Sequence, residues 1–533
     1  MTLPHVLALS ILMVVGCSCQ KLPPNFKFGA ATAAYQIEGG WKADGKGKSV
    51  WDEFVHTHKD AIEDRTNGDV AADSYHLWRE DVRIASELGL DHYRFSISWS
   101  RILPSGLPNN VSKAGVKYYR DLIDELLRQG IEPVVTMYHF DLPLTLQSLG
   151  GWTNPLIVDW FSDYAKVLYS LFADRVKTWI TMNEAVVLCD MMFNTGSLAP
   201  GIKEEELAPF LCNKYLLLAH AKAYRIYERE YKDKYHGRIS LANNIIWIEP
   251  YKYPRDKELA KLGLDFMIGR YSHPIFSKEG GWPPSVEKIL LEYSLKQGFN
   301  YSRLPSFTEE EKKLLKGSAD FYAVNYYTTY VIRPAKKGER GSWFLTGSPE
   351  LDAMMEKPAY AEPSAGVIMP VYPKGLRQTL SYLKKNYGDI DVMITENGYP
   401  GKHQMYDHVR LKFIKDHLTQ VYLAIKEDKV NVIGYTYWAL MDNFEWNSGY
   451  SVAFGLYAIN HNDPKKIRSP RLSSQYYACV IKTHEINVSD QCINENIDKL
   501  HLPHYHSFTN RISASKTVIV VLFLCFMYIY YYR

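Results

Sequence analysis

Several common signatures are missing from this 533-residue sequence. The formal net charge is only +3, and no basic block or alternation of basic and aromatic residues occurs, so a nucleic-acid partner is not expected. The seven cysteines form no Cys-x-x-Cys pair, which removes the usual zinc and redox motifs, and we expect no metal. No Gly-x-Ser-x-Gly segment presents a serine nucleophile. Residues 20–495 contain neither a repeat nor a Pro-, Gly- or Ser-rich linker, which favours one large domain.

The composition is that of an ordinary globular protein, with 46% hydrophobic and 23% charged residues. Aromatic residues reach 14% of the chain, including 12 Trp and 40 Tyr. Most of these rings fill the core, but the excess is also compatible with a site that stacks rings on the apolar faces of sugars.

The first nineteen residues contain no Lys, Arg, Asp or Glu. Leu7 to Val15 form an apolar stretch, and small residues at Gly16 to Cys19 follow it. This pattern predicts that residues 1–19 are a secretory signal peptide.

The other end of the chain predicts a membrane anchor. Thr517 to Tyr532 is an uncharged run of 16 residues, slightly shorter than the ~17–25 residues of a spanning helix. We expect a stalk at residues 496–516 and an anchor at 517–533. A transmembrane helix of type I topology is favoured by the aromatic, Arg-ended tail. Small residues upstream leave a lipid-anchor signal as the alternative.

Cysteines and sequons agree with passage through the secretory pathway. Four cysteines lie between the two end segments and allow three pairings: Cys189, Cys212, Cys479 and Cys492. Proximity makes Cys479–Cys492 plausible, and Cys189–Cys212 is possible. Three Asn-x-Ser triplets, at Asn110, Asn300 and Asn487, are candidate glycosylation sites. We therefore expect a luminal or cell-surface protein.

Short β-rich segments alternate with amphipathic helical patterns along the chain. Eight such segments occur, at residues 26–35, 92–99, 133–139, 178–184, 238–243, 321–326, 391–398 and 432–438. Helical spacing of apolar residues is clear at residues 116–128, 216–231, 376–387 and 409–426. Eight strands alternating with helices predict an α/β fold, a closed parallel (β/α)₈ barrel, with residues 20–495 as one domain with long loops.

Two of the predicted strands end on a glutamate. Asp391 to Gly398 runs through three apolar residues into Glu396, and the segment that begins at Thr178 ends on Glu184. Active sites of such barrels lie at the carboxyl ends of the strands. Two strand-end carboxylates are the simplest constellation for cleaving an acetal bond.

The chain also resembles a known family. The most specific motifs are Ile394–Gly398, Asn183-Glu184, Tyr437–Trp446, Phe28–Gly39, and Asp44–Gly47 with Trp51-Asp52. They stand in the order found in glycoside hydrolase family 1, the β-glucosidase family. The resemblance runs from about Phe26 to Tyr477, and some stretches are most similar to insect members and to anchored animal relatives such as lactase.

The resemblance implies roles for the strand-end residues. Glu396 would be the nucleophile, and Glu184 would be the acid/base with a raised pKa. Arg94 and Tyr327 would hold Glu396 ionised and oriented. Asn183 would hydrogen-bond the sugar 2-hydroxyl.

Other positions match sugar-binding residues of the family. Gln36, His139, Glu445 and Trp446 would bind the glycone, and Trp438 and Phe454 would supply the stacking surfaces. A carboxylate at Glu445 suits neighbouring sugar hydroxyls and would repel a 6-phosphate. The main departure is Ala185, where the family has a proline after the acid/base.

The resemblance implies a retaining β-glycosidase, most of all a β-glucosidase with tolerance for galactosides or fucosides. Its partner would be a small β-glycoside; no cofactor is expected, because two carboxylates suffice, and the oligomeric state stays open. One alternative is a binding or receptor-like relative with weak catalysis. Another is a thioglucosidase acting on sulfated plant glucosides. Insect enzymes of that type are expected to carry a sulfate-binding basic residue shortly after the acid/base, where this chain has Asp190, which disfavours an anionic substrate.

Overall fold

A computed structural model describes residues 20–343, 346–366 and 368–498. The predicted signal peptide and anchor lie outside these ranges, as does most of the predicted stalk. Helix α18 (Asp490–Asp498) extends into the first residues expected to form that stalk. Within the described ranges, no helix combines the length and the hydropathy that crossing a bilayer requires.

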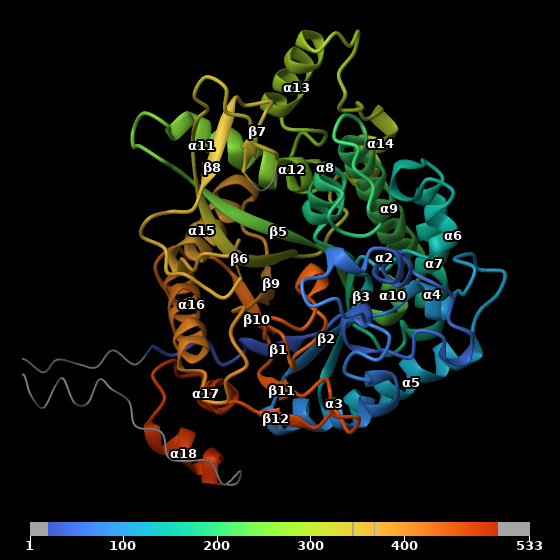
Figure 1. Ribbon diagram of the computed structural model, residues 1–533, viewed down its shortest axis with the longest axis vertical. Helices are drawn as coiled ribbons and strands as arrows, with labels where there is room; N and C mark the ends of the chain where they lie inside the picture. Colours follow the sequence, from blue (N-terminus) through green and yellow to red (C-terminus); the bar gives the residue numbers. More distant parts are fainter. Residues whose placement is uncertain (1–19, 344–345, 367, 499–533) are drawn as a thin grey trace, which may run out of the picture.

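The described chain forms a barrel of eight parallel strands, as predicted (Figure 1). The strands follow one another around the barrel, and β5 closes it by pairing with β6. In chain order they are β1 (Lys27–Ala31), β2 (His92–Ser96), β3 (Glu132–Tyr138), β4 (Thr178–Asn183), β5 (Arg238–Pro250), β6 (Tyr322–Pro334), β9 (Val392–Asn397) and β10 (Val432–Trp438).

Helices surround the barrel, with α7 and α9 on one side and α15 and α16 on the other (Figure 1). They are α1 (Ala34–Ile37), α2 (Val50–Thr57), α3 (Ser74–Leu88), α4 (Trp99–Ile102), α5 (Lys113–Arg128), α6 (Leu144–Gln147), α7 (Ile157–Phe172), α8 (Met192–Thr195), α9 (Ala208–Glu230), α10 (Lys232–Tyr235), α11 (Lys257–Leu264), α12 (Arg270–Phe276), α13 (Pro284–Lys296), α14 (Glu309–Leu315), α15 (Pro373–Tyr387), α16 (His408–Lys426), α17 (Leu472–Thr483) and α18.

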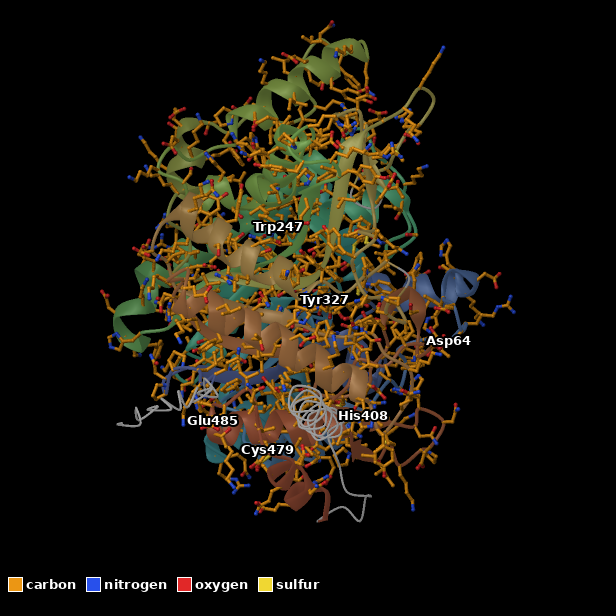
Figure 2. All side chains as sticks on the ribbon, turned by 90° about the vertical axis from the view of Figure 1, so that its left-hand side faces the viewer. Asp64, Trp247, Tyr327, His408, Cys479 and Glu485 are labelled. Carbon is orange, nitrogen blue, oxygen red and sulfur yellow. A yellow bond between two sulfur atoms is a disulfide. The ribbon has the colours of Figure 1, made fainter. Side chains whose placement is uncertain are left out.

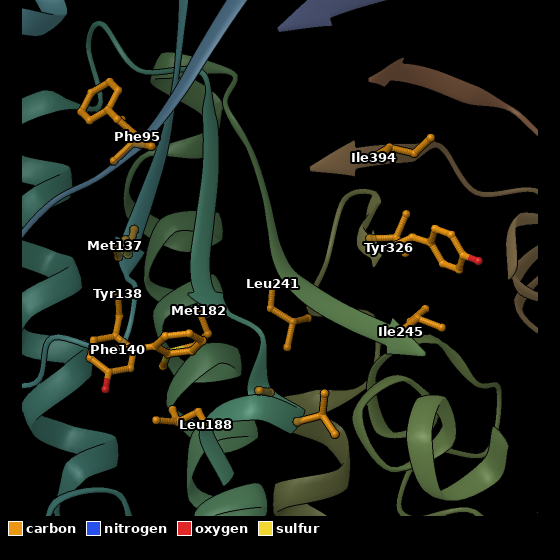
Figure 3. Close-up of a cluster of buried hydrophobic side chains, with 14 of the residues drawn as sticks. Phe95, Met137, Tyr138, Phe140, Met182, Leu188, Leu241, Ile245, Tyr326 and Ile394 are labelled. Atoms are coloured by element: carbon orange, nitrogen blue, oxygen red, sulfur yellow. The ribbon is translucent and has the colours of Figure 1, made fainter. Parts of the chain in front are cut away.

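Outward-facing strand residues form the layer between barrel and helices. Phe95 on β2, Met137 on β3 and Ile394 on β9 are buried in one continuous apolar cluster (Figure 3). Because each strand is covered on both faces, the strands read as apolar runs in the sequence.

Inside the barrel lies a small apolar layer, which we call the floor. It is formed by Val134, Ile180, Ala242, Phe321, Ala323 and Met393, all buried. Two residues further along β3 and β6, the inward positions are Thr136 and Asn325. Polar chemistry therefore begins directly above the floor, toward the carboxyl ends of the strands.

The sheet extends beyond the barrel, which the sequence did not predict. Strands β5 and β6 have 13 residues each and stay paired as far as Pro250 and Ile332. Strand β8 (Ala353–Glu356) adds antiparallel to β6, and β7 (Gly347–Ser348) adds to β8. A separate two-stranded sheet contains β11 (Tyr457–Ile459) and β12 (Arg468–Pro470).

The two ends of the described chain lie side by side. The Leu22 amide donates to the His484 carbonyl at 2.9 Å, and the Ile486 amide donates to the Gln20 carbonyl at 2.9 Å. Disulfides join Cys479 to Cys492 in this region and Cys189 to Cys212 elsewhere. Cys479 and Glu485 lie toward the lower end of the molecule, away from Tyr327 (Figure 2).

Candidate active site

Glu396 lies at the carboxyl end of β9 and is buried. Arg94 on β2 donates from Nη1 to Glu396 Oε1 at 2.5 Å, and the Tyr327 hydroxyl donates to Oε2 at 2.7 Å. The motif continues into Gly398, where a Cβ atom would lie 2.0 Å from the Trp438 carbonyl oxygen. Only glycine fits that close approach. The segment after the glutamate is thus shaped by its packing on β10.

Opposing effects act on the Glu396 carboxyl. Burial is the largest effect and raises the pKa of Glu396 above its usual value, while the Arg94 charge and the hydrogen bonds from Tyr327 and Arg94 act to lower it. Both oxygens accept charge-assisted or phenolic hydrogen bonds, which favour the ionised form. These contacts fix the orientation of the carboxyl and counteract the effect of burial, toward the ionised form that a nucleophile needs.

Glu184 follows β4 and has a quite different environment. Its φ of 47° lies in the left-handed region, which is uncommon for a residue with a side chain. Asn325 and Asn244 both donate to Oε1, at 2.9 and 2.8 Å. Burial, followed by the charge of Glu396, raises the pKa of Glu184 to about 8. This carboxyl is poised to carry a proton at neutral pH.

Arg94 and Asn183 connect the two carboxyls. Arg94 Nη2 donates to Asn183 Oδ1 at 2.7 Å, and Asn325 Nδ2 donates to the same oxygen at 3.1 Å. The Asn183 amide in turn donates to His139 Nε2 at 3.0 Å. Burial and the Arg94 charge hold the pKa of His139 well below its usual value, so the ring is neutral. With Nε2 accepting, Nδ1 carries the proton, and it has no partner among the described residues.

The predicted glycone residues meet beside these carboxyls. The His139 ring stacks against Trp438 and Trp446, with centroids 5.6 and 5.9 Å apart. Gln36 donates to the Phe444 carbonyl at 2.9 Å and to Glu445 Oε2 at 3.3 Å.

Glu445 and the remaining aromatic walls complete the group. Glu445 keeps some solvent contact, yet burial of its carboxyl, with the charges of Glu396 and Glu184, raises its pKa to about 8. Phe454 packs edge-on against Tyr327, with centroids 6.3 Å apart, and joins Trp438 in one buried cluster. Every strand-end residue that the sequence singled out thus lies in one polar layer with aromatic walls.

Asn244 belongs to this layer but was not among the predicted site residues. Its signal lay in the alternation of β5, because Ala242 faces the barrel interior and Asn244 is two residues further on. In a strand that is buried on both faces, however, the sequence does not show which face is inward. Thr395 was missed for the same reason; it donates to Asn325 Oδ1 at 2.7 Å.

Asp190 lies outside the polar layer. Asp190 is buried and accepts from Arg270 Nη2 at 2.6 Å and from the Tyr271 hydroxyl at 2.8 Å. Across residues 20–343, 346–366 and 368–498, no cluster of three acid, histidine or cysteine side chains is arranged to hold a metal ion.

Comparison with known proteins identifies the class. The sequence profile described as "Glycosyl hydrolase family 1" matches residues 18–486. The chain belongs to this family and is a glycoside hydrolase of the retaining, β-glucosidase-like type.

Individual relatives agree with that assignment. "Myrosinase 1" from the aphid Brevicoryne brassicae is 43% identical over 470 residues, which cover 87% of this chain and 99% of the relative. Human "Cytosolic beta-glucosidase" is 42% identical over 87% of this chain and 98% of its own length. A solved aphid myrosinase superimposes with a TM-score of 0.83 at 42% identity, covering 87% of this chain and all of that one.

Proposed function

We propose that this enzyme hydrolyses terminal β-D-glucosides by double displacement, with Glu396 as the nucleophile and Glu184 as the acid/base. The observation that carries the proposal is the contrast between two neighbouring buried carboxyls. Glu396 accepts from a guanidinium and a phenol, whereas Glu184 has neutral amide donors and a pKa raised to about 8. One carboxyl is thereby suited to attack C1 and the other to protonate the leaving oxygen.

In the first step Glu396 attacks C1 and forms a glycosyl ester, while the Glu184 proton passes to the departing oxygen. The negative charge on Glu396 disappears in the ester, so the pKa of Glu184 falls and its carboxylate can accept a proton from the attacking water. Asn183 would bind the 2-hydroxyl, an interaction that tightens in the transition state.

The glycone would lie against the aromatic walls. Trp438 and Phe454 would support the sugar face, and Gln36, His139, Glu445 and Trp446 would bind its hydroxyls. A carboxylate at Glu445 would accept from neighbouring sugar hydroxyls and would repel a 6-phosphate. We propose glucose as the main glycone, with galactose and fucose tolerated.

Mechanism-based labelling tests the nucleophile. A 2-fluoro-β-glucoside with an activated leaving group should inactivate the enzyme, and digestion with mass spectrometry should locate the label on Glu396. A label on any other residue contradicts the assignment.

Removal of the acid/base has a different signature. Glu184→Ala should slow poor leaving groups far more than activated aryl glucosides, and added azide should restore turnover of the activated substrates as the β-glucosyl azide. Equal losses on both substrate types, with no azide effect, would assign proton transfer to another group.

A thioglucosidase is the second candidate, because an aphid myrosinase is among the most similar relatives. Asp190 opposes it: the position that would have to bind sulfate is a buried acid, bonded to Arg270 and Tyr271. Competition between an aryl O-glucoside and a sulfated thioglucoside measures the preference directly. We expect kcat/KM to favour the O-glucoside, and the reverse order would decide for the thioglucosidase.

We also propose a secretory, membrane-anchored enzyme with a signal peptide at residues 1–19 and an anchor at 517–533. Support comes from the two disulfides and from the exposure of all three sequon asparagines: Asn110, Asn300 and Asn487. Glycosidase treatment should increase the electrophoretic mobility of the enzyme from secretory cells. Resistance to phospholipase release and to alkaline extraction would indicate a transmembrane segment rather than a lipid.

A further inference from the structure

Two amides converge on one oxygen of Glu184. Asn325 on β6 and Asn244 on β5 both donate to Oε1, at 2.9 and 2.8 Å. Among the described residues, no group donates a hydrogen bond to the other oxygen, Oε2. The two oxygens of this carboxyl are therefore not equivalent.

The asymmetry determines where the proton of the acid form resides. An oxygen that already accepts two N–H bonds has its lone pairs engaged, and a proton placed there would face the amide hydrogens. The proton of neutral Glu184 therefore belongs on Oε2. In the ionised form the same two donors stabilise the charge.

From this geometry we infer that Asn244 is a positioning residue: with Asn325 it holds Oε1 of Glu184 as a permanent acceptor and directs Oε2, with its proton, at the leaving group. The inference rests on the proposed acid/base role of Glu184. It assigns to Asn244 a function that is separate from sugar binding.

We call the pair Asn244 and Asn325 the clamp on Glu184. The backbone beside Glu184 explains why the side chain needs to be held. Glu184 has its φ at 47°, and the next residue is Ala185, without the ring that would restrict the chain. The peptide is joined to β5 by one bond, from the Glu184 amide to the Ala242 carbonyl at 2.8 Å. Asn244 lies two residues beyond Ala242 on the same strand, so β5 holds both the backbone and the side chain of Glu184.

Three variants test the clamp through the pH profile of kcat/KM on a phenyl β-glucoside, a poor leaving group. Asn244→Ala removes one donor to the ionised form. The pKa of Glu184 should rise, and the alkaline limb should move up by about one pH unit. Glu445 also has a pKa of about 8, but among the described residues Asn244 donates to Glu184 and not to Glu445, so the shift reports on Glu184. Asn244→Asp keeps the size but replaces the donor with a like charge, so its limb should move further in the same direction. We therefore expect the pH of the alkaline limb to increase from the wild type to Asn244→Ala and again to Asn244→Asp.

Asn243→Ala is the matched control. Asn243 is buried, whereas Asn244 is half-buried. The Asn243 amide donates to the Tyr322 hydroxyl at 3.4 Å, and among the described residues it makes no hydrogen bond to Glu184. Its alkaline limb should stay at the wild-type position. Thermal unfolding shows whether each of the three variants is folded. The pH of the alkaline limb does not depend on which fraction of the sample is active, so partial inactivation does not shift it.

Leaving groups provide the second measurement. If Asn244 directs the proton, its loss should reduce kcat several-fold on the phenyl glucoside and much less on a dinitrophenyl glucoside, which needs little protonation. The inference would be overturned if the Asn244 variants changed KM according to the shape of the aglycone while the alkaline limb stayed in place. Asn244 would then be an aglycone contact. A limb that stays in place in both Asn244 variants would also overturn it.

The failure of the wider mechanism would look different. If azide did not rescue Glu184→Ala, the acid/base role itself would be lost, whatever the Asn244 variants did. If azide rescued it but the limb did not move, only the clamp would be wrong.

Discussion

The floor of the barrel and the polar layer above it are built by the same strands, yet they do different work. Val134 and Thr136 are neighbours on one face of β3, and Ala323 and Asn325 are neighbours on one face of β6. A step of two residues along a strand thus separates packing from chemistry. The floor stabilises the barrel, and the polar layer contributes function while burying charge at a cost in stability.

The two layers also differ in how they are specified. Apolar residues of the floor need only fit in volume, so several combinations would do. In the polar layer, Arg94 and Asn325 both donate to Asn183 Oδ1, so the three side chains depend on one another. Loss of a partner there leaves a buried polar group unpaired. Substitutions in the two layers should therefore separate activity from stability.

Glu396→Gln should have the largest effect, in the polar layer. The amide is nearly isosteric and cannot attack C1, so kcat/KM should fall by about 10⁴-fold or more. The thermal midpoint should fall as well, because the buried Arg94 guanidinium loses its charged partner and keeps only a neutral amide acceptor. Steady-state kinetics with calorimetry measure both quantities. Substantial residual activity after exclusion of wild-type contamination would argue against the nucleophile role.

Ile180→Ala is the opposite case, in the floor. It creates a cavity under the site and should lower the free energy of unfolding by about 2–5 kcal/mol. Activity measured well below the unfolding transition should stay near that of the wild type. Denaturant titration gives the stability, and Ile180→Val, expected to cost about 0.5–1.5 kcal/mol, is the graded control. Loss of activity without loss of stability would show that the layers are not separate.

Tyr327→Phe should have a smaller effect on the polar layer. It removes one donor to ionised Glu396, a bond worth about 1.5–3 kcal/mol, so activity should fall about 10- to 100-fold. The pKa of Glu396 should rise, and because the ionised form is the active one, the acid limb of the kcat/KM profile should move to higher pH.

The neighbouring tyrosine supplies the control for that experiment. The Tyr326 hydroxyl lies 2.8 Å from Thr329 Oγ1 and donates to the Tyr372 carbonyl at 2.7 Å, with no contact to Glu396. Tyr326→Phe should leave the acid limb unchanged. An equal shift in both variants would mean that the effect is structural.

Ala185→Pro should have the smallest effect on activity and stability. It tests the comparison between the floor and the polar layer at the edge of the site. Ala185 begins the helical turn after Glu184, a position where proline is tolerated. Reduced freedom of the unfolded chain should add about 0.4–1 kcal/mol of stability. Calorimetry measures it, and the alkaline limb shows whether Glu184 has moved. A marked loss of activity would mean that this chain needs the alanine.

The barrel could be predicted because its information is local. Each of the eight strands is a short β-rich run, and alternation with helices determines the topology. The strand-end glutamates followed from the same pattern, and their neighbours in the site followed from the family resemblance. The extension formed by β7 and β8 could not be found this way, because β8 is four residues long and depends on pairing with residues 331–334.

Asn244 shows the same limit within the site. Its partner, Glu184, is 60 residues away in the sequence, and no spacing rule connects them. The register also shifts between Ile180 and Asn183 where β4 meets β5. Such a bulge changes which side chains face each other, and only the folded sheet reveals it.

The pairing of the two chain ends has a practical consequence. Gln20 and Ile486 are bonded where the barrel strands begin, opposite the carboxyl ends that carry the site. An attachment made at Gln20 or just after Ile486 would lie at the end of the barrel where the strands begin. The carboxyl ends of the strands would then point away from the attachment, so a bead coupled through either segment would present the active sites to the passing substrate.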